Sequence, residues 1–271
     1  MTATTESPPV PATDARPPRP RPNWLLWTGI AVAVLITLWA GRAIEFTLEP
    51  LIYDIDRGRP VLRGFLDPDW DFLQRVIDPF LETFAIAIIA SLVGCSIALV
   101  MALLASRVSA PNHATYWITK QTLSVIRSLP DVAYGMLFVA AVGTGALAGI
   151  LALIFFNLGI AAKLTSETVD AIDPGPVEAA DAVGAGVIER ARVAIVPQVL
   201  PNYISYCLYV FELNIRASVI IGLVGGGGIG SVISVELARF NYDNLSAVIF
   251  ALFVVVFVLD WFSRTMRRRL V

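Results

Sequence analysis

The chain has 271 residues, of which 56% are hydrophobic and only 15% are charged. A soluble domain carries about 25% charged residues, so this chain has too few to cover a water-facing surface. Its net charge of −2 also excludes a strongly basic nucleic-acid-binding protein. The composition therefore predicts an integral membrane protein.

The N-terminal third has three parts. Residues 1–23 hold seven of the 17 prolines, and we expect a disordered tail there. Residues 24–41 are expected to form the first transmembrane helix, because 24–40 is free of charge. The same run is compatible with the apolar core of a secretory signal, although the segment after it is a poor cleavage site. Residues 42–78, with eight acidic residues and five arginines, are expected to form an extracytoplasmic loop.

Residues 79–264 are expected to form a core of five further membrane helices. The run at 132–162 is charge-free for 31 residues, which is longer than the roughly 20 residues that one span needs. Gly143-Thr144-Gly145 divides it into two helices, the first of which reaches back before Pro130. The other apolar runs are 80–105, 203–222 and 245–262. The chain is therefore expected to be all-α, with six transmembrane helices.

The charge distribution predicts that both termini are cytoplasmic. With six spans, 13 of the 20 Lys and Arg residues fall on the cytoplasmic side, as the positive-inside rule requires. The five arginines of 42–78 weaken this agreement. In this topology, residues 265–271 are predicted to be a basic cytoplasmic tail. We expect anionic lipid to be contacted by Lys163 and by the arginines from Arg264 to Arg269, which would anchor the helices.

The segment at 163–200 is the only substantial cytoplasmic loop in this topology. Pro176 is typical of a first helical turn, and Gly184 and Gly186 are typical of a helix end. A short cytoplasmic helix with a tight turn suits the docking of another protein. An ordinary connecting loop explains the same pattern.

This loop reads Glu178-Ala179-Ala180, then Gly184, then Pro197 thirteen residues later. It resembles the EAA motif of the permease subunits of bacterial ATP-binding-cassette (ABC) importers, in which the loop forms a coupling helix that binds the cytoplasmic ATPase. Two apolar positions differ from the usual motif, where this chain has Ala194 and Val196.

The resemblance extends over roughly residues 80–264 and is closest to the phosphonate, phosphite and phosphate permeases. The segments that carry it are Ile126–Pro130, Ala140–Gly145, Pro197–Pro201, Asn214–Ser218 and Gly222–Gly230.

The resemblance implies a type I ABC-importer permease fold in a bacterial inner membrane. A second copy of the chain would complete the pathway, two ATPase subunits would bind ATP and Mg, and an extracytoplasmic protein would deliver the substrate. It also implies that Glu178, Ala179, Ala180, Gly184 and Pro197 couple the chain to the ATPase. The chain itself has no GxxxxGK[ST] phosphate loop and only one histidine and two cysteines. We therefore expect no catalytic residues, no metal site, no cofactor and no nucleic acid partner.

Glu212 and Arg216 are the charges that lie well inside a predicted span, four residues apart on one helix face. They either neutralise each other or face the transport pathway, because intramembrane charges are costly and usually functional. In the second case Arg216 would contact a phosphonate through paired donors. We expect Asn214, Ser218 and Asn157 to assist it as neutral donors.

The glycine run at 225–230 matches G-x-G-x-x-G, but it follows a predicted membrane helix, and a dinucleotide site requires a preceding strand. We expect it to provide backbone flexibility and close packing.

The function predicted overall is a homodimeric permease for phosphonate or a related oxyanion. An ABC permease for another solute, such as an amino acid, remains an alternative. An ion-coupled secondary transporter is a second alternative.

Overall fold

The computed structural model describes residues 24–47 and 55–267, and all its regular elements in that part are helical. The chain divides into two units, Met1–Asp56 and Arg57–Val271. In the first unit, helix α1 (Trp24–Ala43) is a continuous apolar helix with no buried residue. The predicted tail at 1–23 lies outside the described residues, as does 268–271.

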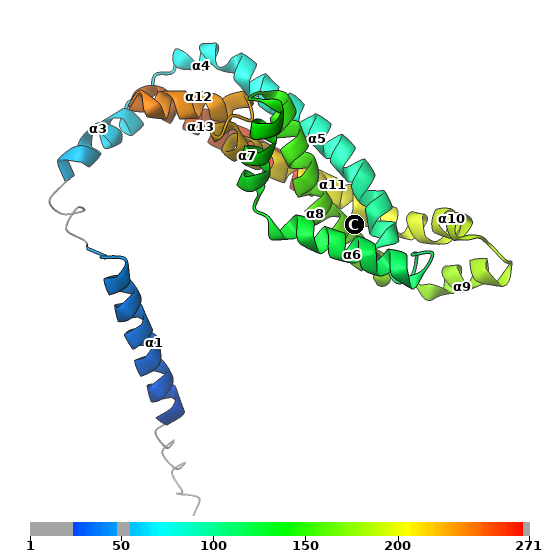
Figure 1. The fold of residues 1–271 in the computed structure, drawn as a ribbon. Coiled ribbons are helices and arrows are strands. Elements are labelled where there is room, and N and C mark those ends of the chain that lie inside the picture. The colour runs from blue at the N-terminus through cyan, green and yellow to red at the C-terminus, as the bar shows by residue number, and fades with distance from the viewer. Residues whose placement is uncertain (1–23, 48–54, 268–271) are drawn as a thin grey trace, which may run out of the picture. The chain divides into compact units, whose positions relative to one another are not determined.

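The remaining helices belong to the second unit, except that the first two residues of α3 belong to the first (Figure 1). In chain order they are α3 (Ile55–Leu66), α4 (Phe72–Arg75), α5 (Ile77–Leu104), α6 (His113–Ser128), α7 (Asp131–Val142), α8 (Ala146–Asp170), α9 (Pro174–Ala182), α10 (Val187–Arg190), the π-helical turn η1 (Ala191–Ile195), α11 (Val196–Leu223), α12 (Gly228–Ala238) and α13 (Tyr242–Arg267).

Five helical segments are long and apolar enough to cross a membrane: α1, α5, α8, α13 and the continuous segment Val187–Leu223, which ends in α11. The pair α6 and α7 passes the same test together, but it is bent by 89° at the break around Pro130. The structure therefore contains five candidate spans, or six when the bent pair counts as one, and the second count equals the predicted number. The expectation that the helix ending at Val142 reaches back before Pro130 is wrong, because α6 ends at Ser128 and α7 begins at Asp131.

The division of the 132–162 run is confirmed. Helix α7 ends at Val142 and α8 begins at Ala146. Gly143 and Gly145 between them have φ angles of +88° and +129°, which are conformations that glycine adopts at low cost. The turn at this position therefore follows from the local sequence.

Helices α5, α8 and α11 lie side by side in the centre of the second unit (Figure 1). Small side chains line their contacts and let the helix backbones approach closely, as is typical of membrane helices. The fully buried alanines are Ala87, Ala90, Ala98 and Ala102 of α5 and Ala152, Ala161 and Ala162 of α8. Helices α6 and α7 pack on α8, and α12 and α13 pack on α11.

The described part of the 42–78 segment is largely helical. Its helix α3 packs against the start of α13, where the Ser246 hydroxyl donates a hydrogen bond of 2.8 Å to the Gly64 carbonyl. Nearby, the Asp69 amide donates a hydrogen bond of 3.2 Å to the Asp243 carbonyl. These contacts hold the polar segment against the helical core.

Candidate functional site

The segment at 163–200 contains two short helices. Helix α8 continues through Lys163 as far as Asp170, so the first part of this segment is a helix end. Helix α9 then starts at Pro174, and the Asp173 side chain caps it by accepting a hydrogen bond of 3.0 Å from the Gly175 amide. Proline and an aspartate cap at a helix start are the combination that local preferences favour.

Gly184 makes the turn between α9 and α10. Its φ angle is +79°, in the left-handed region that strongly favours glycine. An ion pair of 3.3 Å between Arg190 and Asp181 joins the two helices across this turn. Helices α9 and α10 therefore form a defined helical hairpin.

Four of the predicted coupling residues lie in α9 or in the turn of this hairpin, and Pro197 lies at the start of α11. Glu178 and Ala179 are exposed on α9, whereas Ala180 is half-buried and packs on a small core that includes Val177 and Ile195. Gly184 and Pro197 are exposed. The hairpin thus presents Glu178 and Ala179 outward and uses Ala180 for its own packing.

Large apolar side chains are exposed around the same turn. Val183 is 84% exposed, Ile188 is 82% exposed and Val193 is 71% exposed. Exposed apolar side chains that gather around one turn are typical of a protein-binding surface.

The hairpin is connected directly to a membrane helix. Helix α10, η1 and α11 run on from one another, so that Val187–Leu223 forms a single helical segment of 37 residues. Near the start of α11, the Gln198 side chain donates a hydrogen bond of 2.8 Å to the Ala194 carbonyl and accepts one of 3.2 Å from the Asp173 amide. The hairpin is therefore continuous with α11.

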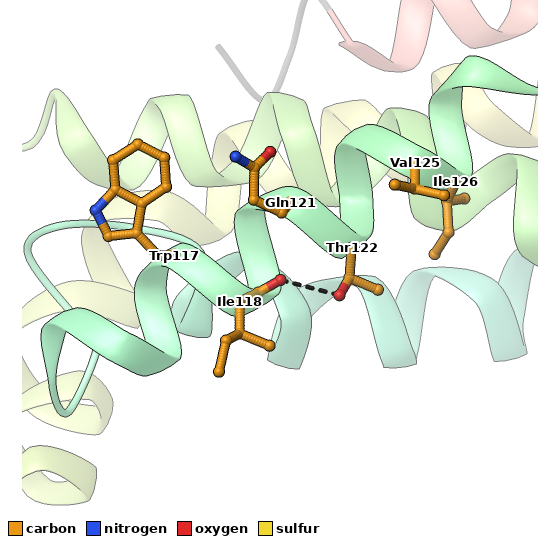
Figure 2. A pocket seen from close by; sticks show the side chains of 6 residues that line it. All are labelled: Trp117, Ile118, Gln121, Thr122, Val125 and Ile126. Carbon is orange, nitrogen blue, oxygen red and sulfur yellow. Dashed lines mark hydrogen bonds between the residues drawn. The ribbon is translucent and has the colours of Figure 1, made fainter.

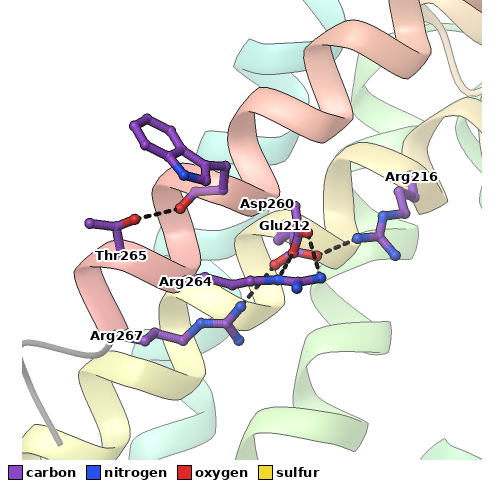
Figure 3. A network of polar contacts seen from close by, with 7 residues as sticks. Glu212, Arg216, Asp260, Arg264, Thr265 and Arg267 are labelled. Atoms are coloured by element: carbon purple, nitrogen blue, oxygen red, sulfur yellow. Dashed lines mark hydrogen bonds and ion pairs between the residues drawn. The ribbon is translucent and has the colours of Figure 1, made fainter.

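Farther along α11, Glu212 and Arg216 form the ion pair that their spacing predicts. The structure adds a partner that the sequence does not indicate: Arg267, at the end of α13, contacts the other oxygen of the Glu212 carboxylate at 3.1 Å. Figure 3 shows Glu212 between the two arginines. Because two cations share one buried carboxylate, the cluster carries a net charge of +1.

Asn157, Asn214 and Ser218 are buried rather than placed on an open surface. The Asn157 amide donates a hydrogen bond of 2.9 Å to the Ala90 carbonyl of α5. The Asn214 amide donates one of 2.7 Å to the Ser91 hydroxyl. These bonds join α8 and α11 to adjacent residues of α5, while the Arg216 guanidinium is bonded to Glu212. The structure therefore brings the two asparagines together at α5 and separates Arg216 from them.

The glycine run connects α11 to α12. Gly225, Gly227 and Gly228 have φ angles of +104°, +81° and +66°. The Gly225 carbonyl accepts a hydrogen bond of 2.8 Å from the Gly145 amide, at the turn that precedes α8. The expected close packing is confirmed, because a Cβ on Gly149 would lie only 2.4 Å from the Gly226 carbonyl oxygen. The element before the run is helix α11, not the strand that a dinucleotide site requires.

Comparison with known proteins places this geometry in a family. Residues 98–271 match the family described as "Binding-protein-dependent transport system inner membrane component". The phosphite transport system permease of Stutzerimonas stutzeri is 34% identical over 75% of this chain and 74% of its own length. The phosphate-import permease of Mycolicibacterium smegmatis is 36% identical over 70% of this chain, which spans only 36% of that longer protein.

A solved structure shows the same fold. The permease chain of the MetNI methionine ABC transporter, in an inward-facing conformation, superposes with a TM-score of 0.64 at 20% identity. The match covers 72% of this chain and 96% of that chain. With the helical hairpin, the apolar spans and the sequence matches taken together, the chain belongs to the binding-protein-dependent transport system inner membrane component family, the multi-pass permease subunits of ABC importers.

Proposed function

We propose that two copies of this chain form the pathway by which an ATP-driven importer moves a phosphorus oxyanion across the inner membrane. Both termini are cytoplasmic in this proposal, and membrane lipid surrounds the spans. Two cytoplasmic ATPase subunits bind ATP and Mg and hydrolyse the ATP, so this chain is a transporter subunit and not itself an enzyme. An extracytoplasmic binding protein delivers the substrate.

The observation that carries the coupling proposal is the hairpin of α9 and α10. It projects exposed apolar side chains, among them Val183 and Ile188, and it continues into the 37-residue helical segment that contains α11. Glu178, at the exposed face of α9, offers a carboxylate to a basic residue of the ATPase. Movement of the ATPases would bias the helices only if the hairpin binds them differently in the two transport states.

The cargo proposal is supported by the names of the relatives, which include phosphate, phosphite and phosphonate permeases. The net positive charge around Glu212 is compatible with an anionic cargo. An amino acid is the alternative cargo, supported by a probable D-methionine permease of Haemophilus influenzae at 24% identity. Family membership favours either of these over an ion-coupled secondary transporter.

Replacing Gly184 with valine tests the coupling proposal. A β-branched residue at φ +79° is strongly disfavoured, so Gly184→Val should distort the turn and abolish substrate-stimulated ATP hydrolysis. Gly186→Ala is the matched control, because Gly186 has a φ angle of −68° that alanine adopts without strain.

The assay measures ATP hydrolysis by the transporter reconstituted with its ATPase and its loaded binding protein. Both variants should insert into the membrane as the wild type does. Stimulated hydrolysis at the wild-type rate in Gly184→Val would refute the coupling role. The cargo is tested by binding of phosphate, phosphite, methylphosphonate and methionine to the binding protein, where affinity for methionine alone would refute the oxyanion proposal.

A further inference from the structure

Arg127 occupies an unusual position at the end of α6. It directly precedes the break at which α6 and α7 bend by 89°. Its side chain packs over α8, since a Cβ built on Gly159 would lie 2.7 Å from Arg127 Cγ. Gly159 belongs to the charge-free part of α8, four residues before Lys163. Arg127 therefore lies against the apolar part of the helix bundle, not beyond its polar end.

A cavity of about 480 Å³ opens at this break. Arg127, Asp131 and Tyr134 contribute its polar side chains, and Phe155 and Phe156 of α8 are among its apolar walls. The Tyr134 hydroxyl donates a hydrogen bond of 2.7 Å to the Ile126 carbonyl. An apolar cavity of this size with a few convergent polar groups is the usual form of a small-ligand site.

Unlike the two arginines around Glu212, Arg127 is not paired with a carboxylate in the part of the chain that the structure describes. Within residues 24–47 and 55–267 it makes no hydrogen bond and no ion pair. In contrast, Arg216 and Arg267 share Glu212, and Lys163 pairs with Glu167 at 2.5 Å. Arg127 is exposed, so its guanidinium is available to an anionic ligand.

A second cavity, on the exposed face of α6, lacks these properties. It measures about 540 Å³ and is lined by Trp117, Ile118, Gln121, Thr122, Val125 and Ile126. Figure 2 shows that the Thr122 hydroxyl turns back to the Ile118 carbonyl, to which it donates a hydrogen bond of 2.9 Å. No cation lines this cavity, so it does not suit an anion.

We propose that Arg127 binds the phosphorus oxyanion inside the permease, in the cavity at the break between α6 and α7. The proposal rests on the proposed function for its cargo and adds the residue that contacts it. The planar guanidinium presents paired N–H donors that match two oxygens of a tetrahedral oxyanion.

Asp131 keeps this site weak. Its carboxylate lines the same cavity, and one of its oxygens accepts a hydrogen bond of 2.9 Å from the Val132 amide. Its negative charge opposes that of the anion. A pathway site must release what it admits, so a carboxylate beside the arginine serves transport better than a second cation.

The first test compares uptake by transporters reconstituted with the ATPase and the binding protein. Inorganic phosphate, phosphite and methylphosphonate serve as probes at saturating concentration. Arg127→Gln should lower the maximal uptake rate at least about tenfold for the probe that the wild type carries, because it removes a charge-assisted pair of hydrogen bonds. Arg127→Lys, which keeps the charge, should recover part of the rate.

Lys120→Gln is the matched control. Lys120 is a cation on the same helix, but it donates a hydrogen bond of 2.6 Å to the Tyr116 hydroxyl and does not line the cavity at the break. Its uptake rate should stay within about twofold of the wild type. Wild-type uptake by Arg127→Gln, or an equal loss in Lys120→Gln, would overturn the proposal.

The second test uses the unmodified transporter and does not depend on uptake or on the folding of a variant. An arginine-specific dicarbonyl reagent is applied with and without inorganic phosphate, and modified peptides are quantified by mass spectrometry. Phosphate should slow modification of Arg127 at least about threefold and leave Arg107, which donates to Tyr116 at 3.2 Å, unaffected. Equal modification of Arg127 with and without phosphate would overturn the proposal.

The two tests separate this proposal from the proposed function. If the wild type carries phosphate but Arg127 is neither needed nor protected, only the role of Arg127 fails. If the wild type carries none of the probes, the proposed cargo fails, and protection by phosphate still decides whether the cavity binds an oxyanion.

Discussion

Replacing Gly230 with alanine should separate α12 from α11. A Cβ on Gly230 would lie 2.1 Å from the Val219 carbonyl oxygen and 2.8 Å from Gly222 Cα. Both are backbone atoms of α11, so no change of side-chain rotamer relieves the contact. The two helices would have to move apart by roughly 1 Å, which is the overpacking that destabilises a well-packed interior.

Gly230→Ala is expected to lower the free energy of unfolding by about 3 kcal/mol. This is the upper end of the usual range for overpacking, because the obstructing atoms belong to the backbone. For a domain of about 200 residues each kcal/mol lowers the Tm by about 2–4 °C. Gly230→Ala should therefore lower the Tm of the detergent-purified permease by roughly 6–12 °C.

Gly58→Ala is the control for this measurement. A Cβ on Gly58, in α3, meets no atom within 4 Å, and alanine favours a helix over glycine by about 0.5–1 kcal/mol. Its Tm should equal or slightly exceed that of the wild type. If Gly230→Ala unfolds at the wild-type temperature, the close contact between α11 and α12 does not exist in the native protein.

Two further predictions concern buried carboxylates. Glu212→Gln leaves Arg267 without its partner and should lower the free energy of unfolding by about 1–3 kcal/mol after allowance for solvent screening. A double-mutant cycle with Arg267→Gln, measured by thermal unfolding, should show that the two losses are not additive. Additive losses would contradict the pairing. Burial alone would raise the pKa of Glu236, but hydrogen bonds from Asn244 and Asn241, together with the charges of Arg239 and Arg75, outweigh it and lower the pKa below its ordinary value of 4.5. The stability from this carboxylate is then fully present above pH 4.5 and decreases as the pH falls through the folded-state pKa. Glu236→Gln should flatten the acid side of the stability profile, and an unchanged profile would contradict the assignment.

The apolar helices and the break at 143–145 follow from the sequence because their causes are local. A long run without charges requires a helix in the bilayer, and the glycines at 143 and 145 end one helix and begin the next. The hairpin at 163–200 is similar, since Asp173, Pro174 and Gly184 cap, start and end α9 through contacts within a few residues. The pairing of Glu212 with Arg216 also depends only on helical spacing.

The partners of the buried polar residues could not be predicted from the sequence and are known only from the tertiary structure. Arg267 lies 55 residues from Glu212, and no local pattern indicates that the end of α13 lies beside the middle of α11. Asn157 and Asn214 face α5 because three helices pack on one another, a result that depends on the rotation of each helix within the bundle. In the sequence, Arg127 is one more basic residue, three positions before a proline.

The sequence by itself determined that this is a helical membrane protein with a helical hairpin that resembles the EAA loop of ABC permeases, because periodicity, capping and apolar length act over a few residues. Only the tertiary structure decided which charges are neutralised and which remain available. Electrostatic compensation depends on distances between side chains of different helices, and those distances are set by packing. Arg216 and Arg267 thus share one carboxylate, while Arg127 faces a cavity at a broken helix.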